Sequence, residues 1–406
     1  MSAVDTVARG LAAEARGAVR RREASGPRGA SPLPLAQQLR STAAMLARVR
    51  AGTASGTIAL LGDSTSFGTG ASGRTQDYAH RLAAILSAGG VPAETDGVYG
   101  LHGFSAGGLA AYDNRLTMGA GWTGNTMSIA GTMFSNTADT SVMTFTPERQ
   151  VNAFDLLYPT DPQFGTVGVS IDGGAPQSVS LQQRYGTWAW NGTVWAQTVG
   201  AAAAAATFGR ATFLCPTGTH TISIARASGN VKISGVRGYR TDLRQVHIAN
   251  WGRPGETAGG WAAGNSYWNL RSANGFQVIL KPDLTLIDLG INDVNTSVPA
   301  DTYAANLQNV VTGALLSTRD VALVVPVPSW DAGNLALSKQ LAMRARLEEV
   351  AAANTLPIIA DMPARWGEYA GGSGLGFYGA AADGIHPWDT GYADKAQAIA
   401  RVLLSL

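Results

Sequence analysis

The sequence is poor in cysteine and in charge, and both shortages limit what the protein can be. Cys215 is the single cysteine among 406 residues, which excludes an intramolecular disulfide and a metal site built from cysteines. Charged residues make up 14% of the chain, against about 25% in typical globular proteins, and the net charge is only +2. We therefore expect no broad nucleic-acid-binding surface. No apolar run approaches the roughly 18 residues that cross a bilayer.

The start of the chain differs in charge from the rest. Residues 1–50 contain nine arginines and three acids, a net charge of +6, so the remaining residues carry −4. The opening stretch lacks the apolar core of a secretion signal. The glycines and prolines of 26–34 predict a short helix, a flexible hinge and then the main body. We interpret residues 1–50 as a basic helical segment that can dock a partner, with a targeting peptide as the alternative. A cytoplasmic and a virion-associated location both remain open.

Helix and strand patterns alternate in two separate parts of the chain, 51–111 and 241–406. The first part has a buried strand at 57–61 and an amphipathic helix that begins after the N-cap Asp77. The second part predicts strands at 245–249, 284–289, 321–327 and 356–360, and helices near 258–273, 300–317, 334–353 and 389–405. Together with the strand at 57–61 these make five predicted strands, which would form a parallel sheet covered by helices on both faces.

The intervening residues 112–240 have almost no helical periodicity. Eight short alternating runs, separated by turns such as Asp172-Gly173-Gly174, predict a β-sandwich or jelly roll. This all-β domain would be inserted into the α/β domain, so we expect its ends to lie close together and its core to be independent. Trp188 and Trp190 share one strand face and would form either a platform for sugar rings or a cross-strand core pair.

Three short motifs follow predicted strands, and would therefore lie at the carboxyl ends where an open α/β sheet binds its ligands. A nucleophilic serine needs a base, an orienting carboxylate and donors for the oxyanion, and the motifs supply all of these residue types. The motifs and the residues expected to react in them are Leu61–Ser64 with Ser64, Leu289–Asp293 with Asn292, and Asp383–Pro387 with Asp383 and His386.

These motifs resemble the sequence blocks of the SGNH/GDSL hydrolase family, which occur here in the family's order. The resemblance covers about 51–111 and 241–406, and it implies a flavodoxin-like, three-layer α/β/α domain that hydrolyses an ester through an acyl-serine. Any one block recurs by chance, but four in order are specific. The blocks are Gly62-Asp63-Ser64, Asn250-Trp251-Gly252-Arg253-Pro254-Gly255, Gly290-Ile291-Asn292-Asp293 and Asp383-Gly384-Ile385-His386.

The resemblance also implies a role for each matching residue. Ser64 would attack the ester carbonyl, His386 would take its proton, and Asp383 would orient the imidazole. The oxyanion hole would consist of the backbone N–H groups of Ser64 and Gly255 together with the side chain of Asn292. No metal or cofactor is implied.

The chain departs from a minimal family member in one respect, since Ser64 and Gly255 are separated by the all-β insert. Similar modules occur in family members that act on carbohydrates, including phage tail esterases that deacetylate polysaccharide. We therefore predict hydrolysis of a small acyl ester, O-acetyl on a carbohydrate, with Trp388 bordering the substrate cleft. A lipase or thioesterase for longer chains is one alternative. A non-catalytic, glycan-binding virion or surface protein is the other.

A second pattern in the first part of the chain points to a different chemistry. Residues 68–73 fit G-x-G-x-x-G, with Glu94 and Asp96 further on, as in a dinucleotide site. The pattern starts six residues beyond the strand, whose tip Ser64 already occupies, so we interpret it as a glycine-rich loop beside the active site. The other four histidines are interpreted as surface or core residues.

Overall fold

The computed structural model of the chain describes most of its residues, and the fold is given for these alone. The basic segment 1–32, most of the alanine tract and the second half of the helix predicted near 258–273 lie outside them. The described residues are 33–100, 106–125, 133–138, 141–182, 185–190, 195–201, 207–263, 280–330, 333, 336–379 and 383–406.

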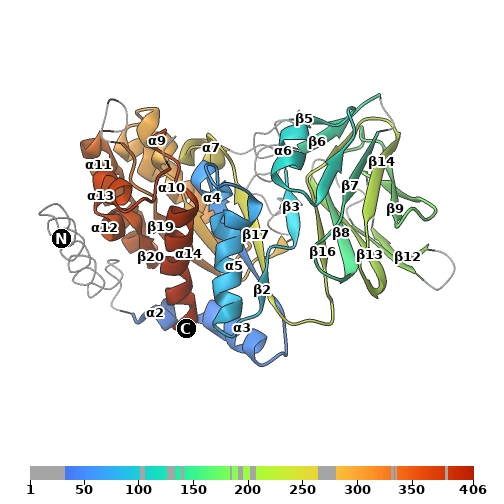
Figure 1. The fold of residues 1–406 in the computed structure, drawn as a ribbon, viewed down its shortest axis with the longest axis horizontal. Helices are drawn as coiled ribbons and strands as arrows, with labels where there is room; N and C mark the ends of the chain where they lie inside the picture. Colours follow the sequence, from blue (N-terminus) through green and yellow to red (C-terminus); the bar gives the residue numbers. More distant parts are fainter. Residues whose placement is uncertain are drawn as a thin grey trace, which may run out of the picture.

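A sheet of six parallel strands forms the centre of the α/β region (Figure 1). The predicted parallel sheet is confirmed, but the predicted count of five strands is one short, because the edge strand β2 has only two residues. Without β2, the five longer strands have the 2-1-3-4-5 order of flavodoxin-like folds. The strands in spatial order are β2 (Ala93–Glu94), β17 (Val246–Gly252), β1 (Gly56–Gly62), β18 (Leu284–Asp288), β19 (Asp320–Val325) and β20 (Ile358–Asp361).

Helices cover both faces of this sheet. Along β1, Ile58 and Leu60 pack into one buried cluster while Ala59 and Leu61 pack into the other, as the alternation of strand side chains requires. One face is covered by α3 (Arg40–Arg50), α5 (Tyr78–Ala88) and α14 (Asp389–Leu404), and the other by α7 (Ala258–Ala263), α10 (Ala300–Leu315) and α11 (Leu337–Ala353). The remaining short helices are α2 (Leu35–Gln38), α4 (Ser64–Phe67), η1 (Arg74–Gln76), α6 (Ala106–Tyr112), α9 (Ile291–Asn295), α12 (Met362–Trp366) and α13 (Glu368–Gly374).

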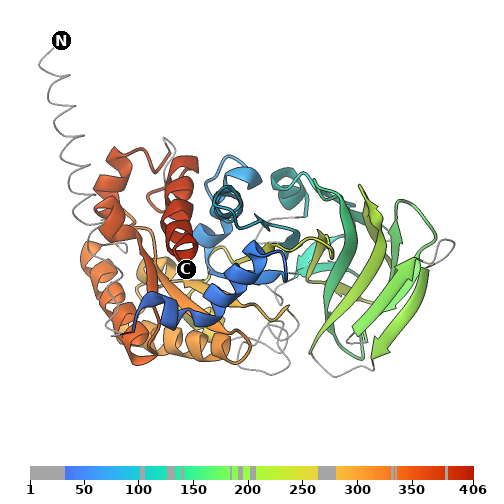
Figure 2. The ribbon, with the colours of Figure 1, turned by 90° about the horizontal axis from the view of Figure 1, so that it is seen from below.

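Residues 97–239, here called the β region, lie beside the α/β region (Figure 2). The first of their three sheets is antiparallel: β10 (Gln177–Ser180), β9 (Thr166–Ile171), β14 (Ile222–Ser228), β7 (Val142–Phe145) and β4 (Leu116–Met118). The second is antiparallel except for the β11–β13 pair: β12 (Trp195–Ala201), β11 (Tyr185–Trp190), β13 (Thr207–Gly218), β8 (Val151–Thr160), β16 (Gly235–Tyr239) and β3 (Gly97–Tyr99). The third comprises β15 (Val231–Ile233), β6 (Met133–Asn136) and β5 (Thr123–Asn125).

The β region begins earlier than the sequence pattern suggested and shares its core with the α/β region. Its strand β3, at residues 97–99, precedes the predicted boundary at 112. A single buried cluster includes Phe154 and Ile224 of the β region together with Leu61 and Leu289 of the α/β region. The expectation of an independent core is therefore wrong. Apolar surface of the two regions is buried jointly, and each region depends on the other for part of its stability.

Candidate active site

Ser64 begins the one-turn helix α4 directly after β1. The side chain of Asp63 caps this turn, since its Oδ1 accepts hydrogen bonds from the Thr65 N–H at 2.8 Å and the Thr65 hydroxyl at 2.9 Å. Burial raises the pKa of Asp63 to about 7, and the nearby Asp288 carboxylate adds to this rise. The Ser64 backbone N–H occupies the first helical position, where no intrahelical acceptor exists.

Glycines allow the turn to sit close against the neighbouring strands. A Cβ added to Gly62 would lie 2.0 Å from Ser66 Oγ, and one added to Gly252 would lie 2.2 Å from the Phe67 nitrogen. Asn250 then holds the end of the turn, because its Nδ2 donates to the Ser66 and Phe67 carbonyls at 3.1 and 3.2 Å. Sequence reasoning assigned no role to Asn250, although it lies in the second family block.

His386 and Asp383 lie in the loop that precedes α14. The His386 Nε2 is 2.7 Å from Ser64 Oγ, and its Nδ1 contacts the Asp383 Oδ2. The other Asp383 oxygen accepts hydrogen bonds from the backbone N–H groups of Ile385 and His386, both at 2.9 Å. Burial alone would raise the pKa of Asp383, but the hydrogen bonds from His386 and Ile385 hold it below its ordinary value. Serine, imidazole and carboxylate therefore form one chain of contacts.

A second Asp-x-x-His pair, which the sequence analysis overlooked, has a different environment. Asp77 Oδ1 caps α5 through the His80 N–H and contacts the His80 Nδ1, both at 2.9 Å. The His80 Nε2 lies 2.6 Å from an Arg74 guanidinium nitrogen. Since the guanidinium can only donate, that Nε2 is already occupied as an acceptor and cannot take a proton from a nucleophile. This arrangement indicates a structural pair.

The three groups predicted for the oxyanion hole come from loops after neighbouring strands. Gly255 lies in the turn after β17 with a φ of +78°, and nothing lies within 4 Å of where its Cβ would be. Asn292, in α9 after β18, donates one Nδ2 hydrogen to the Glu256 carbonyl at 2.9 Å, which ties the two loops together. Its second amide hydrogen has no acceptor among the described residues. Within the described residues, the backbone N–H groups of Ser64 and Gly255 have no acceptor.

Residues around these groups explain other parts of the sequence pattern. Asp293 is fully buried, and its Oδ2 accepts from the Ala258 N–H at 3.0 Å, which caps α7. Burial raises the pKa of the Asp293 carboxyl to about 6. Gly70, from the G-x-G-x-x-G pattern, packs so closely that a Cβ there would lie 3.0 Å from the Cβ of His386. This loop therefore borders His386.

Two tryptophans with exposed rings flank the Asp383–His386 loop. Trp388 is 44% exposed and Trp330 is 57% exposed. The Trp330 N–H donates to the Gly384 carbonyl at 2.7 Å, and a Cβ added to Gly384 would lie 2.7 Å from the Trp330 Cβ. No local sequence pattern indicates a role for Trp330, because its contact with Gly384 joins residues that are far apart in the chain.

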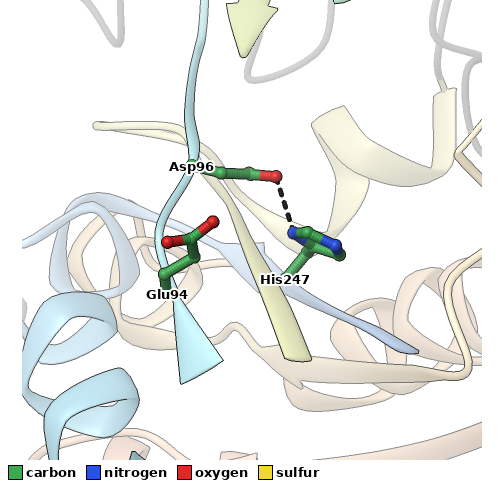
Figure 3. Close-up of side chains that lie close together, drawn as sticks. All are labelled: Glu94, Asp96 and His247. Atoms are coloured by element: carbon green, nitrogen blue, oxygen red, sulfur yellow. Dashed lines mark ion pairs between the residues drawn. The ribbon is translucent and has the colours of Figure 1, made fainter. Parts of the chain in front are cut away.

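One cluster outside this site has the residue types that bind metals. Glu94, Asp96 and His247 bring one ligand atom each within 4.8 Å of one another, where the chain passes to and returns from the β region (Figure 3). The His247 Nδ1 is 2.8 Å from Asp96 Oδ2. Guanidinium groups also face these carboxylates, with Arg237 at 3.7 Å from Asp96 and Arg149 at 3.6 Å from Glu94. Protein cations thus already face both carboxylates, and we interpret the cluster as an ion-pair network.

The sequence matches a known family over part of its length. Residues 224–393 match the GDSL-like lipase/acylhydrolase family, a range that contains Gly255, Asn292, Asp383 and His386 but begins after Ser64. The predicted resemblance to the family is therefore confirmed over this part of the chain. No curated protein matches the sequence.

Several solved structures are similar to this chain in fold, although their sequence identity to it is low. A peptidoglycan O-acetylesterase is 15% identical, covers 90% of this chain and 95% of its own, and superposes with a TM-score of 0.59. An acetylxylan esterase from Geobacillus stearothermophilus is 20% identical, with 40% and 74% coverage and a TM-score of 0.31. A family two carbohydrate esterase from Cellvibrio japonicus is 11% identical, with 74% and 97% coverage and a TM-score of 0.30. The first of these supports the fold over nearly the whole chain.

Proposed function

We propose that this chain, a member of the SGNH/GDSL esterase family through residues 224–393, is a serine esterase that removes an acetyl group from a carbohydrate. The observation that carries the hydrolytic part of the proposal is the 2.7 Å contact between Ser64 Oγ and His386 Nε2, with Asp383 on the far side of the imidazole. The family match independently supports an esterase.

The proposed reaction has two steps. Ser64 Oγ attacks the ester carbonyl while His386 Nε2 takes the hydroxyl proton, and Asp383 stabilises the imidazolium that forms. The tetrahedral intermediate then collapses, His386 gives its proton to the leaving sugar hydroxyl, and an acetyl-Ser64 ester remains. In the second step His386 deprotonates a water, which attacks this ester. Acetate leaves and the proton returns to Ser64.

The negative charge of each tetrahedral intermediate would be held by three donors. The Ser64 and Gly255 backbone N–H groups and the second amide hydrogen of Asn292 are the candidates, since none of the three is used within the described residues. Donors fixed in advance stabilise the developing oxyanion without a cost of reorientation during the reaction. The bond from Asn292 to the Glu256 carbonyl supports this role, because it fixes the orientation of the amide.

The carbohydrate part of the proposal rests on the flanking tryptophans. Trp330 and Trp388 keep about half of their surface exposed beside the Asp383–His386 loop. Exposed aromatic faces held by backbone contacts can stack on the apolar C–H face of a sugar ring at little entropic cost. The solved peptidoglycan O-acetylesterase agrees with this substrate class as a fold-level analogy.

We propose the following organisation of the chain. Residues 1–50 are a basic segment that docks a partner, residues 51–111 and 241–406 are the hydrolase domain, and residues 112–240 are an inserted β-sandwich that holds part of a bulky substrate. Two largely antiparallel sheets in the β region, whose buried side chains belong to one cluster, support the sandwich assignment. Among the described residues, no helix has the length and apolar character needed to span a membrane.

A lipase or thioesterase is the second candidate within the same chemistry. It would need an apolar channel for a long acyl chain at Ser64. A cavity of about 530 Å³ between α9, α11, α12 and α14 is lined by neither Ser64 nor His386. This cavity therefore does not provide such a channel. The third candidate, a non-catalytic glycan-binding protein, conflicts with the intact contacts of Ser64, His386 and Asp383.

A substrate series tests the proposal. Wild type should hydrolyse p-nitrophenyl acetate faster than the butyrate, octanoate and decanoate esters, and it should release acetate from acetylated polysaccharide. Trp330→Ala and Trp388→Ala should slow only the reaction on polysaccharide. A rate that increases with acyl length would instead identify a lipase or thioesterase. A folded wild type without activity on any ester would identify the non-catalytic alternative.

A further inference from the structure

One face of α14 holds the loop that follows the nucleophile. Asp389, Tyr392 and Lys395 are spaced three apart and therefore lie on the same side of the helix. Their partners on the loop are spaced to match. Asp389 accepts from the Ser72 N–H at 2.8 Å and hydroxyl at 2.6 Å, the Tyr392 hydroxyl donates to the Thr69 carbonyl at 2.6 Å, and the Lys395 ammonium donates to the Thr65 carbonyl at 3.2 Å.

Lys395 contacts the residue that directly follows Ser64, and its side chain is completely buried. Its ammonium pairs with Asp288 Oδ2, and the same oxygen accepts a hydrogen bond from Ser66 Oγ at 3.0 Å. The ammonium also lies 4.5 Å from the centre of the Tyr78 ring. A buried ammonium is costly unless it is paired and hydrogen-bonded. This one is both, and one of its partners, Thr65, belongs to the nucleophile turn.

The same helix directly follows the loop that contains the base, His386. α14 begins at Asp389, three residues after His386, and Gly391 in its first turn packs so closely that a Cβ there would lie 2.9 Å from the Cβ of Pro387. The loop after Ser64 returns to this point, since Gly70 packs on His386. Nucleophile and base come from opposite ends of the sequence, and α14 is the element that contacts the segments of both.

We propose that Lys395 and Tyr392 are positioning residues, which hold the Ser64 turn against the helix that directly follows the His386 loop and so set the separation of Ser64 Oγ and His386 Nε2. Neither residue touches the substrate. Their effect is geometric, because a displacement of about 1 Å in a reacting group costs about 100-fold in rate. This inference rests on the proposed function only in requiring that Ser64 is the nucleophile.

The variants separate positioning from a general contribution to stability. Lys395→Met keeps the length of the side chain but removes the ammonium, and Tyr392→Phe removes only the hydroxyl that reaches Thr69. The matched control is Asp394→Asn on the same helix. It removes the charge and one of the two oxygens that accept from Arg365 and Trp366, and Asp394 makes no hydrogen bond or ion pair with the nucleophile loop among the described residues.

The readouts are kcat and KM for p-nitrophenyl acetate and the rate at which phenylmethanesulfonyl fluoride labels Ser64, together with thermal unfolding. We expect Lys395→Met to lower kcat and the labelling rate by about 10- to 100-fold, with KM changed by less than about threefold. Tyr392→Phe should lower both by about 3- to 10-fold, as expected for one hydrogen bond. Asp394→Asn should lower the melting temperature but keep both rates.

If Tyr392→Phe and the folded fraction of Lys395→Met keep wild-type rates, or if Asp394→Asn loses as much rate as they do, the positioning role is wrong. Tyr392→Phe keeps the ring in the core, so it remains informative even if Lys395→Met does not fold. Failure of the proposed function has a different signature. In that case wild type itself neither hydrolyses the acetate nor is labelled at Ser64.

Discussion

The α/β region and the β region bury their strands in different ways. Helices cover both faces of the parallel sheet, so β18 and β19 are buried at every residue. In the β region, β9 alternates between buried and half-buried residues, because one face of its sheet is less covered. Parallel strands also all end at one edge, where successive loops meet, whereas antiparallel hairpins distribute their turns between both ends. The candidate reactive groups lie at the carboxyl ends of the parallel strands. We therefore expect substitutions there to affect activity, and substitutions in the β region to affect stability.

The largest effect should come from a substitution at the carboxyl ends of the parallel strands, where Ser64 lies. Ser64→Ala removes the nucleophile and should lower kcat on p-nitrophenyl acetate by about 10³- to 10⁶-fold. Circular dichroism and the melting temperature should remain those of wild type, because the change deletes one hydroxyl from a capped turn. Full activity in a folded Ser64→Ala protein would contradict the mechanism.

A core residue of the β region should affect stability instead of chemistry. Phe154→Ala in β8 empties a fully buried site and should lower the free energy of unfolding by about 3–5 kcal/mol. Since Phe154 shares one buried cluster with Leu61 and Leu289, esterase activity and the β-sheet signal should be lost in a single transition. Activity that survives a first transition would show that the two regions unfold independently. For the same reason we expect deletion of residues 112–240 to destabilise the whole chain.

The oxyanion hole should respond almost as strongly as the core. Asn292→Ala removes a proposed donor to the oxyanion and should lower kcat by about 10²- to 10³-fold. KM should change little, because the bond to the oxyanion strengthens only in the transition state. An increase in KM with kcat unchanged would mean that Asn292 binds substrate uniformly. Steady-state kinetics on p-nitrophenyl acetate distinguish the two outcomes.

The last effect concerns the pH dependence of stability. The pKa of Asp63 is raised from 3.8 to about 7 in the folded state, so its contribution to stability is complete below about pH 4 and is lost as the pH rises through 7. In Asp63→Asn this loss is absent, while the amide oxygen still caps Thr65. Relative to wild type, the variant should gain up to about 4 kcal/mol between pH 4 and pH 8. Urea unfolding across this range measures the difference, and parallel curves would contradict it.

The sequence predicted best what depends on local pattern. The long strands of the parallel sheet and the motifs after them follow from apolar runs that stop at Gly62-Asp63-Ser64 and Gly290. The two-residue β2 and three-residue β3 are too short to show a period, and they pair through the register of distant strands. The shared core could not be foreseen either, because which apolar faces meet depends on how the two regions pack.

The residues of the site that were not predicted from the sequence also depend on contacts between distant parts of the chain. Lys395 appears in the sequence as one charged residue in an amphipathic helix, where a lysine is ordinarily exposed. Its complete burial depends on Asp288, which is more than a hundred residues away along the chain. Trp330 and Asn250 likewise gain their roles from contacts with distant residues. The proposed reacting groups could be predicted from the family blocks, whereas the residues that hold those groups in place could be identified only from the fold.

The central claim is that an acyl group is transferred to Ser64 at the edge of the parallel sheet. Acid quenching during turnover of p-nitrophenyl acetate, followed by peptide mass spectrometry, tests it directly. The account predicts an acetyl group on Ser64 in the peptide that contains the nucleophile turn, and no adduct in Ser64→Ala. An acetyl group on any other residue in an active protein, or undiminished turnover in Ser64→Ala, would contradict it.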